Sequence, residues 1–401
     1  MISGAAMFSC HLAETLAERG NRVLVVAASD RGRSYCEEKG NLKVARINSI
    51  ANPARVGQRF LLWPVREIHA ALQEFRPEVI HLHDPFQLAD IAIAYARKVN
   101  IPAILTIHGH PGLITSMLPG NTMLQRMVEE WLWGIATHME GHVQAWVTPT
   151  ESNARLVERH TAIHPIVISN GIDLQSFSDD PLSFQVNQGI REHLGIPEKA
   201  RIVLHVGRLD PGKNVHMVIQ AAAQVIKGDL CKNIHLLVVG DGIEKNALQK
   251  QAETLGISSA CHFPGYIRDK EILSAIYRCS DLFLMSSIIE TQGIVLLEAA
   301  ASGLPIVAVN ATAIPEVVIH GVNGFLVPAG DVKSMARHIG EILNDGNLLN
   351  RMRLASRQVA LQHDFKRSVD AYEHVYSSVL SEGQVVTKSI PVSIGLSEVD
   401  G

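Results

Sequence analysis

The feature that most constrains the fold is an alternation of short, branched apolar segments with amphipathic helical patterns, which occurs twice along the chain. Such alternation is typical of βαβ units that build a parallel sheet. The apolar segments are residues 23–27, 44–47, 79–83, 103–108, 145–147 and 166–169, then 202–206, 234–239, 261–263, 282–285, 306–309 and 325–327. Because 401 residues exceed what one core usually organises, the sequence predicts an α/β protein with two Rossmann-like, doubly wound domains.

A polar stretch separates the two sets of segments. Residues 173–188 have no apolar periodicity and contain Pro181, as is typical of a linker. We therefore predict an N-terminal domain over residues 1–172, a linker over 173–200 and a second domain over 201–362. Residues 363–382 are a predicted helix with one apolar stripe, and 383–401 a loose tail. The stripe comprises Phe365, Val369, Tyr372, Val375, Tyr376 and Val379.

The first domain lacks its expected opening strand. A strand should lead into the turn at Ser3, Gly4 and Ala5, yet only Met1 and Ile2 precede it. The first strand of a doubly wound sheet is central, so its absence predicts an unpaired groove within the sheet. Either the start is truncated, or another segment of a variant fold occupies that position.

Charge, cysteine content and hydropathy exclude several classes of protein. A formal charge of -4 provides no basic surface for DNA or RNA, so no nucleic-acid partner is expected. The five cysteines are scattered without a CxxC pair, which favours reduced thiols in the cytoplasm over a disulfide framework. The longest apolar stretch, residues 294–310, is interrupted by Glu298, Gly303 and Pro305, so no membrane-spanning helix is predicted.

The segment SSIIETQGIVLLEAAASGLP, residues 286–305, carries the most chemical information. It predicts a strand end, a loop that contains Glu290 and Gly293, and then a helix. Backbone amides around Gly293 would lack intrahelical acceptors, and with the helix dipole they suit a phosphate. Glu290 and Glu298 are spaced to bind a sugar and a ribose. The alternative for Glu298 is a structural role in which the dipole alone stabilises its charge.

A second segment, HVGRLDPGKNV at residues 205–215, follows another predicted strand. Ligands of open α/β sheets bind at this carboxyl edge. Arg208 and Lys213 bring a planar and a compact cation to a glycine-containing loop, which suits a diphosphate. Isolated cations of this kind are usually solvated surface residues, but beside a second anion-binding element they favour phosphate binding.

Two HxH strings support a competing hypothesis. His81 and His83 end one predicted strand, and His108 and His110 end the next. Alternate residues of a strand point the same way, so a pair could hold a metal together with Asp84, as in a metal-dependent hydrolase. No further carboxylate has an obvious ligand spacing. We therefore expect His108 to donate a hydrogen bond to a bound sugar instead.

In this order, the segments resemble glycosyltransferase family four, a large group of retaining enzymes with the GT-B fold, in which two Rossmann-like domains face each other across a cleft. The resemblance covers nearly the whole chain. Its C-terminal motifs are VGRLDPGKN, GDGIEKNAL, FPGY and two glutamates separated by seven residues. Its N-terminal motifs are VIHLHDPF, LTIHGH, VTPTESN and SNGID.

The resemblance implies a nucleotide-diphosphate sugar as donor and a role for each matching residue. Arg208 and Lys213 would bind the diphosphate, and Glu298 the ribose. Glu290 and His108 would be catalytic residues at the reacting sugar. The full set of implied donor-binding residues is Gly4, Arg208, Lys213, Tyr266, Ile267, Glu290, Thr291, Gln292, Gly293, Ile294 and Glu298. No metal or cofactor is implied, because cations and a helix dipole stabilise the departing nucleotide. In this family the final helix also crosses back onto the N-terminal domain.

The resemblance narrows the substrates further. A UDP-sugar is the expected donor, with UDP-glucose as the default. The string ETQG, where many relatives have EGFG, is similar to members that glycosylate diacylglycerol. A membrane lipid is therefore the expected acceptor, with a saccharide as the alternative, and the enzyme would act at the inner face of a membrane. A catalytically dead nucleotide-sugar binder is the non-enzymatic alternative.

A lipid acceptor requires a surface for peripheral membrane contact. Residues 55–66 mix three arginines with apolar residues and could lie at an interface. We favour an ordinary helix packed on the sheet for this segment. Residues 123–133 are a second candidate, but they are acidic at Glu129 and Glu130, and we predict that they belong to the core.

Overall fold

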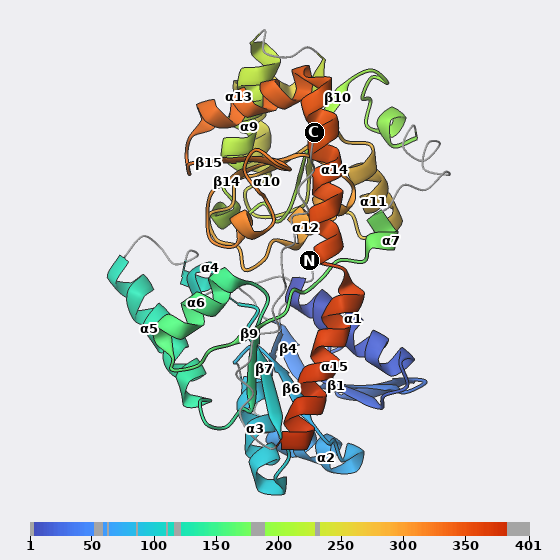
Figure 1. Cartoon of the computed structure of the whole chain (residues 1–401), viewed down its shortest axis with the longest axis vertical. Helices are drawn as coiled ribbons and strands as arrows, with labels where there is room; N and C mark the ends of the chain where they lie inside the picture. Colours follow the sequence, from blue (N-terminus) through green and yellow to red (C-terminus); the bar gives the residue numbers. More distant parts are fainter. Residues whose placement is uncertain are drawn as a thin grey trace, which may run out of the picture.

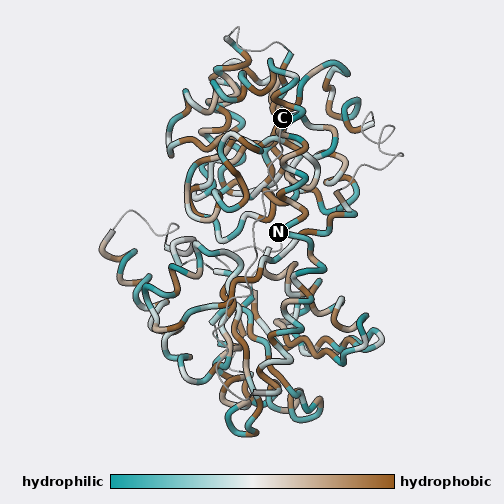
Figure 2. Tube along the Cα trace, viewed as in Figure 1, coloured by the Kyte–Doolittle hydropathy of each residue, from teal (hydrophilic) through white to brown (hydrophobic). Residues whose placement is uncertain are grey.

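The computed structural model describes residues 4–51, 59–61, 64–85, 87–109, 111–115, 122–177, 189–228 and 233–382. These residues form two α/β domains, one above the other in Figure 1, with strands inside and helices outside. Figure 2 shows hydrophobic segments running through the interior of both domains, while hydrophilic segments lie mostly at the periphery. The predicted fold class of two Rossmann-like domains is confirmed.

The C-terminal domain is built on a six-stranded parallel sheet in the order β12-β11-β10-β13-β14-β15. Its strands are β10 (Arg201–Val206), β11 (Ile234–Val239), β12 (Cys261–Gly265), β13 (Leu282–Met285), β14 (Ile306–Val309) and β15 (Gly324–Val327), each overlapping a predicted segment. Val203 packs into the core on one face of the sheet, and its neighbour Leu204 packs into the core on the other. Burial on both faces explains why these strands are continuous apolar runs.

Helices cover both domains. In the N-terminal half they are α1 (Gly4–Glu18), α2 (Val65–Phe75), α3 (Gln87–Val99), α4 (Pro111–Thr115), α5 (Thr122–His138), α6 (Glu151–His160) and α7 (Leu174–Phe177). In the C-terminal half they are α9 (Val215–Lys227), α10 (Lys245–Thr254), α11 (Lys270–Arg278), α12 (Ile294–Ala301), α13 (Val332–Asn344), α14 (Gly346–Gln362) and α15 (Phe365–Glu382). Short 3-10 turns occur at Pro211–Lys213, Ser258–Ala260 and Ile314–Glu316.

The strands of the N-terminal domain form separate sheets. One has the order β1-β3-β2 and another the parallel order β6-β7-β8-β9, while β4 and β5 form an antiparallel pair. The strands are β1 (Val23–Ala28), β2 (Tyr35–Lys39), β3 (Leu42–Ile47), β4 (Ser49–Ala51), β5 (Arg59–Leu61), β6 (Ile80–His83), β7 (Ala103–Thr106), β8 (Ala145–Thr148) and β9 (Ile166–Val167).

Strands β1 and β6 lie on either side of the position where the sequence predicts an unpaired groove, which stays a prediction. Each of these strands ends the order of its own sheet, and within the described part of the chain neither pairs with a second neighbour. Leu24 and Val26 of β1 nevertheless pack against the core that contains Ile80 and Leu82 of β6. Every residue of β1 is only half-buried, whereas Ile202 and Leu204 of the central strand β10 are fully buried.

Helix α15 crosses from the C-terminal half and lies along the N-terminal domain, shown in red in Figure 1. Its predicted stripe is buried: Val369, Tyr372 and Val375 pack against Phe8 of α1 and Ile104 of β7. The chain also crosses between the domains beside this helix. The Ile172 amide donates to the His363 carbonyl oxygen at 2.8 Å, and the Phe365 amide donates to the Ile172 carbonyl oxygen at 3.1 Å.

Two expectations for the N-terminal domain are wrong. Residues 59–61 form strand β5 rather than a helix, and α2 begins only at Val65; residues 52–58 and 62–63 lie outside the described residues. Residues 123–133 do not all belong to the core. Met123, Met127 and Trp131 of α5 are 73%, 61% and 65% exposed, whereas Trp133 is 4% exposed. Helix α5 is amphipathic as its sequence indicates, but part of its apolar side faces solvent. None of the described helices is long and apolar enough to cross a membrane.

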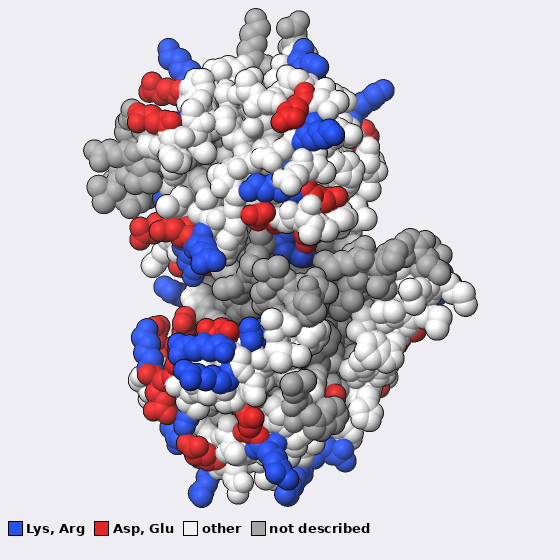
Figure 3. Space-filling view, turned by 180° about the vertical axis from the view of Figure 1, so that it is seen from behind, with Lys and Arg blue, Asp and Glu red and all other residues white. Residues whose placement is uncertain are grey.

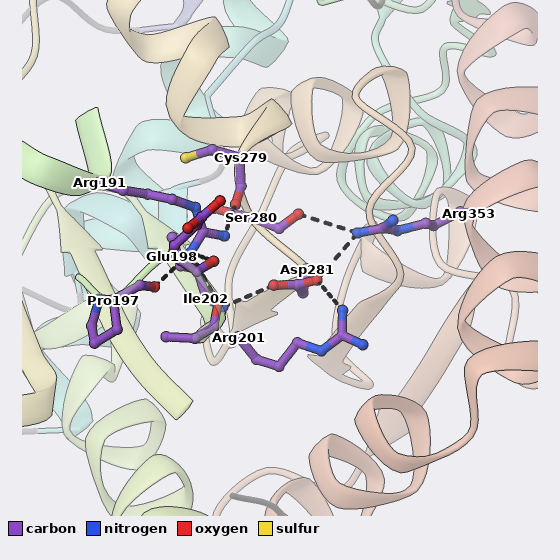
Figure 4. A network of polar contacts seen from close by, with 10 residues as sticks. Arg191, Pro197, Glu198, Arg201, Ile202, Cys279, Ser280, Asp281 and Arg353 are labelled. Carbon is purple, nitrogen blue, oxygen red and sulfur yellow. Dashed lines mark hydrogen bonds and ion pairs between the residues drawn. The ribbon is translucent and has the colours of Figure 1, made fainter. Parts of the chain in front are cut away.

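The buried carboxylate of Asp281 connects neighbouring strands at the amino-terminal edge of the C-terminal sheet (Figure 4). Asp281, just before β13, accepts hydrogen bonds from the Arg201 guanidinium at 2.7 Å and from the Ile202 amide at 2.9 Å. Arg353 of α14 lies 3.4 Å from the same carboxylate. These contacts are at the amino ends of the strands, away from the loops that hold the predicted site, so we assign Asp281 a structural role.

Candidate active site

The loop between β13 and α12 has the predicted strand, loop and helix arrangement. Gly293 lies just before the helix with a φ of 74°, a left-handed conformation that glycine adopts at little cost. A Cβ added there would lie 3.0 Å from Leu296 Cδ1, so the position is also crowded. The amides of the first turn of α12 have no carbonyl ahead of them in the helix, and they sit at the positive end of its dipole.

The predicted diphosphate-binding residues Arg208 and Lys213 each form an ion pair, and the ion pair of Lys213 reaches this loop. Lys213 donates to the Glu290 carboxylate, and these side chains are 17% and 10% exposed. Arg208 pairs with Asp210. The Ser286 hydroxyl donates to the Lys213 carbonyl oxygen at 2.9 Å, which ties the β10 loop to the β13 loop. Both cations therefore lie in the loop after β10, at the carboxyl edge of the sheet, as predicted, and their roles toward a ligand stay predictions.

The loop after β11 packs directly against the Arg208 loop. A Cβ on Gly240 would lie 1.8 Å from the Gly207 carbonyl oxygen, and one on Gly242 would lie 2.4 Å from that of Leu209. Only glycine permits such an approach of two backbones. The GDG string is thus explained by loop packing. Tyr266 and Ile267 follow β12 on the same edge; Tyr266 is 40% exposed, and Ile267 packs against the core.

Glu298 lies within α12, whereas Glu290 lies in the loop before it, and the two carboxylates have different environments. The Tyr277 hydroxyl donates to its carboxylate at 2.7 Å. Burial raises the pKa of Glu298 to about 7, an effect that the Tyr277 hydrogen bond and the charge of Lys270 partly offset. Tyr277 was missed by the sequence analysis, since nothing in its helical pattern distinguishes it from a core residue. The Glu298 carboxyl therefore changes its charge near pH 7.

On the N-terminal domain the predicted site residue is His108, at the start of the loop after β7. Its Nε2 atom lies 2.9 Å from His83 Nδ1. The Asp84 carboxylate accepts from the amides of His108 and Gly109 at 2.8 Å and 2.9 Å, which fixes the backbone of this loop. Burial lowers the pKa of His108 to about 4. The imidazole is therefore neutral at physiological pH and acts as a hydrogen-bonding group rather than as a cation.

The described residues of the HxH strings, His81, His83 and His108, do not form a metal centre. The two ring nitrogens of His81 are occupied by Tyr376 at 2.8 Å and Thr106 at 2.7 Å. His110 lies outside the described residues. Over the residues that the structure describes, no group of three or more His, Cys, Asp or Glu side chains could hold a metal ion. His81 instead fastens α15 to β7.

The two domains bring their helix N-termini together at the site. A Cβ added to Gly4, the first residue of α1, would lie 2.9 Å from Ile294 Cδ1, at the start of α12. Figure 3 shows the molecule from behind, with Lys and Arg side chains on the surfaces of both domains. The predicted residues Gly4 and Ile294 therefore meet, although they are far apart in the sequence.

Further contacts cross between the domains at the donor loop, and the sequence analysis missed them. The Gln292 side chain accepts from the Asn170 amide at 2.9 Å and donates to the Ser169 hydroxyl at 2.6 Å. The Thr150 hydroxyl, at the start of α6, donates to the Thr291 carbonyl oxygen at 2.8 Å. Residues 291 and 292 thus connect the predicted donor loop to the N-terminal domain.

A carboxylate from one domain also covers the end of a helix from the other. Glu316 accepts from the amides of Glu151 and Ser152, at the N-terminus of α6, at 2.9 Å and 2.7 Å. Such charge-assisted bonds are each worth about 1.5–3 kcal/mol. They favour the closed arrangement of the two domains over an open one.

We expect Glu316→Ala to loosen this arrangement. Loss of the two charge-assisted bonds should raise the radius of gyration in small-angle X-ray scattering of the protein without ligand. It should also raise the KM for the donor about tenfold, because closure precedes productive binding. Glu158→Ala, in α6 but with its carboxylate paired to His164 of the same domain, is the control. Unchanged scattering and KM in Glu316→Ala would mean that other contacts hold the domains together.

Comparison with known proteins agrees with this geometry. Residues 186–359 match the family Glycosyl transferases group 1, and residues 2–176 match Glycosyltransferase Family 4. The alpha-monoglucosyldiacylglycerol synthase of Streptococcus pneumoniae is 27% identical over 309 residues, which cover 77% of this chain and 68% of that protein. The enzyme of the same name from Acholeplasma laidlawii is 23% identical over 364 residues, covering 88% and 87%.

A solved structure has the same architecture. Anabaena Alr3699/HepE, in complex with UDP and glucose, superposes with a TM-score of 0.74 at 19% identity, covering 94% of this chain and 96% of that one. This likeness concerns the fold, which is GT-B. Because family models match both halves of the chain, the chain belongs to the group 1 and family 4 glycosyltransferases.

Proposed function

We propose that this glycosyltransferase moves a hexose, with retention of configuration, from a UDP-sugar to a hydroxyl group of a membrane lipid. The observation that carries the donor half is the convergence of Lys213, Arg208 and the N-terminus of α12 at one strand edge, opposite His108. Cations and a helix dipole at one point suit a diphosphate leaving group. Neutral His108 and the carboxylate of Glu290 then contact the sugar.

The transfer needs no protein nucleophile. The acceptor hydroxyl forms a bond to the anomeric carbon as the bond between that carbon and the β-phosphate oxygen breaks, and the hydroxyl proton passes to the departing phosphate. Lys213 and the α12 amides stabilise the charge on UDP. The Asn170 side chain interacts with the His108 imidazole and partly offsets the lowering of its pKa by burial, so Asn170 orients the ring that faces the sugar.

The proposal that the acceptor is a membrane lipid rests on two observations. Alpha-monoglucosyldiacylglycerol synthases are among the relatives, and their name describes transfer to a diglyceride lipid. The exposed apolar side of α5, with Met123, Met127 and Trp131, lies on the N-terminal domain next to α4, which follows the His108 loop. An amphipathic helix of this kind can rest its apolar side in a membrane interface, so a lipid acceptor would reach the site without leaving the bilayer.

Thermal unfolding with UDP, GDP and ADP tests the donor assignment. A ligand that binds only the folded state raises its melting temperature. We expect UDP to raise it by several degrees and to do so equally with and without EDTA, because the diphosphate site consists of Arg208, Lys213 and backbone amides. A larger shift with GDP would assign a different donor. No shift with any nucleotide would contradict the site.

A further inference from the structure

A cavity of about 270 Å³ lies between the two domains beside the predicted reacting sugar. One wall is Glu290 and Thr312 of the C-terminal domain. The other wall is α6 of the N-terminal domain, which contributes Ser152, Asn153, Arg155, Leu156 and Arg159. The volume of the cavity is close to the lower limit of about 300 Å³ for small-molecule sites. The proposed donor does not contact the α6 wall, which leaves that wall for another molecule.

The α6 wall carries two like charges without compensation. Arg155 and Arg159 are four residues apart, so their side chains neighbour each other on one side of the helix. Within the described residues, neither forms an ion pair with a carboxylate. Glu158 of the same helix pairs with His164 instead, and Glu290 across the cavity pairs with Lys213. Two guanidinium groups at this spacing suit one phosphate or carboxylate group, which accepts paired N–H bonds.

The cavity is also joined to both halves of the reaction site. The Asn153 side chain donates to the Ile107 carbonyl oxygen at 3.1 Å, immediately before His108. The Ser152 hydroxyl donates to the Thr312 carbonyl oxygen at 3.1 Å, and the Thr312 hydroxyl accepts from the Glu290 amide at 2.8 Å. A molecule held in this cavity therefore lies next to Glu290, and Asn153 connects the α6 wall of the cavity to the loop that carries His108.

We propose that Arg155 and Arg159 bind an anionic group, phosphate or carboxylate, on the acceptor, whose hydroxyl then points toward the anomeric carbon of the donor. This proposal rests on the proposed function and narrows its acceptor from a neutral diglyceride to a molecule that carries negative charge. The anionic group does not react; it orients the acceptor. The same chemistry is offered by the headgroup of an anionic lipid and by a soluble sugar phosphate.

The first test measures binding of glycerol 3-phosphate by calorimetry with UDP at saturation, so that the diphosphate site is already filled. We expect Arg155→Gln/Arg159→Gln to weaken this binding at least tenfold while UDP affinity stays unchanged. Arg66→Gln, which removes an exposed arginine from α2, is the matched control and should bind like the parent. Equal glycerol 3-phosphate affinity in the double variant and the parent would overturn the proposal, as would no binding to the parent.

The second test identifies the source of the anionic group. Transfer from UDP-glucose is measured to phosphatidylcholine vesicles that contain phosphatidylglycerol, to vesicles that contain diacylglycerol, and to soluble glucose 6-phosphate or glucose. Either charged acceptor should be preferred over its neutral counterpart, and the double variant should lose that preference. A preference for diacylglycerol that the double variant keeps would overturn the proposal. Failure of UDP to bind the parent would contradict the donor site instead, so the two failures are distinguishable.

Discussion

Replacing Lys213 with methionine is expected to lower kcat/KM for sugar transfer by about a hundredfold to a thousandfold. The substitution removes a cation that faces the departing diphosphate, and the loss of one such group usually costs this much. It also leaves the Glu290 carboxylate, which is only 10% exposed, without its ion-pair partner. Removing one partner of a buried pair destabilises the protein more than the pair itself stabilises it.

Two further variants separate the catalytic effect of Lys213 from the structural one. In Lys213→Met/Glu290→Gln no unpaired charge remains, so the melting temperature should recover, while activity should stay below that of Glu290→Gln alone. Lys227→Met removes an exposed lysine from the end of α9 in the same domain and should leave both quantities unchanged. Recovery of activity together with stability in the double variant would show that Lys213 serves only to neutralise Glu290.

The fold could be predicted because most strands are buried on both faces. Residues 282–285 and 306–309 are apolar throughout, and they form β13 and β14 with those bounds. Strand β2 was missed because its residues, Tyr35–Lys39, are mostly exposed and polar at the edge of its sheet. The exposed side of α5 was also misjudged, since a periodic apolar pattern shows that a helix has an apolar side but not that another element covers it.

Of the candidate site, too, only part could be predicted from the sequence. Lys213, Glu290 and Gly293 follow strands along the chain, so the carboxyl edge of one sheet was enough to predict that they meet. The role of His81 depends on Tyr376, which lies 295 residues away on a helix from the other half of the chain. The contacts of Gln292 and Glu316 depend on how the domains are placed relative to each other. No local pattern carries that information.

The affinity for UDP is expected to rise between pH 6 and pH 8 because of Glu298. Burial raises the pKa of this carboxyl from its ordinary value of 4.5 to about 7. Ribose hydroxyls donate hydrogen bonds, and the charged carboxylate accepts them more strongly than the neutral acid does. Below pH 7 binding must first remove a proton, which costs up to about tenfold in affinity per pH unit. Above pH 7 the carboxylate is already formed, and the dependence should level off.

The stability of the free protein should change in the opposite sense. Because the pKa is higher in the folded state, the folded protein holds this proton in the window between pH 4.5 and about 7, whereas the unfolded chain has released it. The contribution of Glu298 to the free energy of unfolding therefore falls as pH rises through that window. UDP should then raise the melting temperature more at pH 8 than at pH 6, since it binds the form that is costly to the free protein.

The variant Glu298→Gln separates the effect of Glu298 on the pH dependence of UDP affinity from the ionisation of UDP itself, which is the same for both proteins. At pH 8 the variant should bind UDP about tenfold to a hundredfold more weakly, the usual cost of a lost charge-assisted hydrogen bond. Its affinity should depend on pH only as the phosphate does. Glu253→Gln, on α10, removes a charge elsewhere in the same domain and should keep the parent's profile. If Glu298→Gln also kept that profile, Glu298 would be the structural partner of Tyr277 alone, and the ribose would have to bind elsewhere in the cleft.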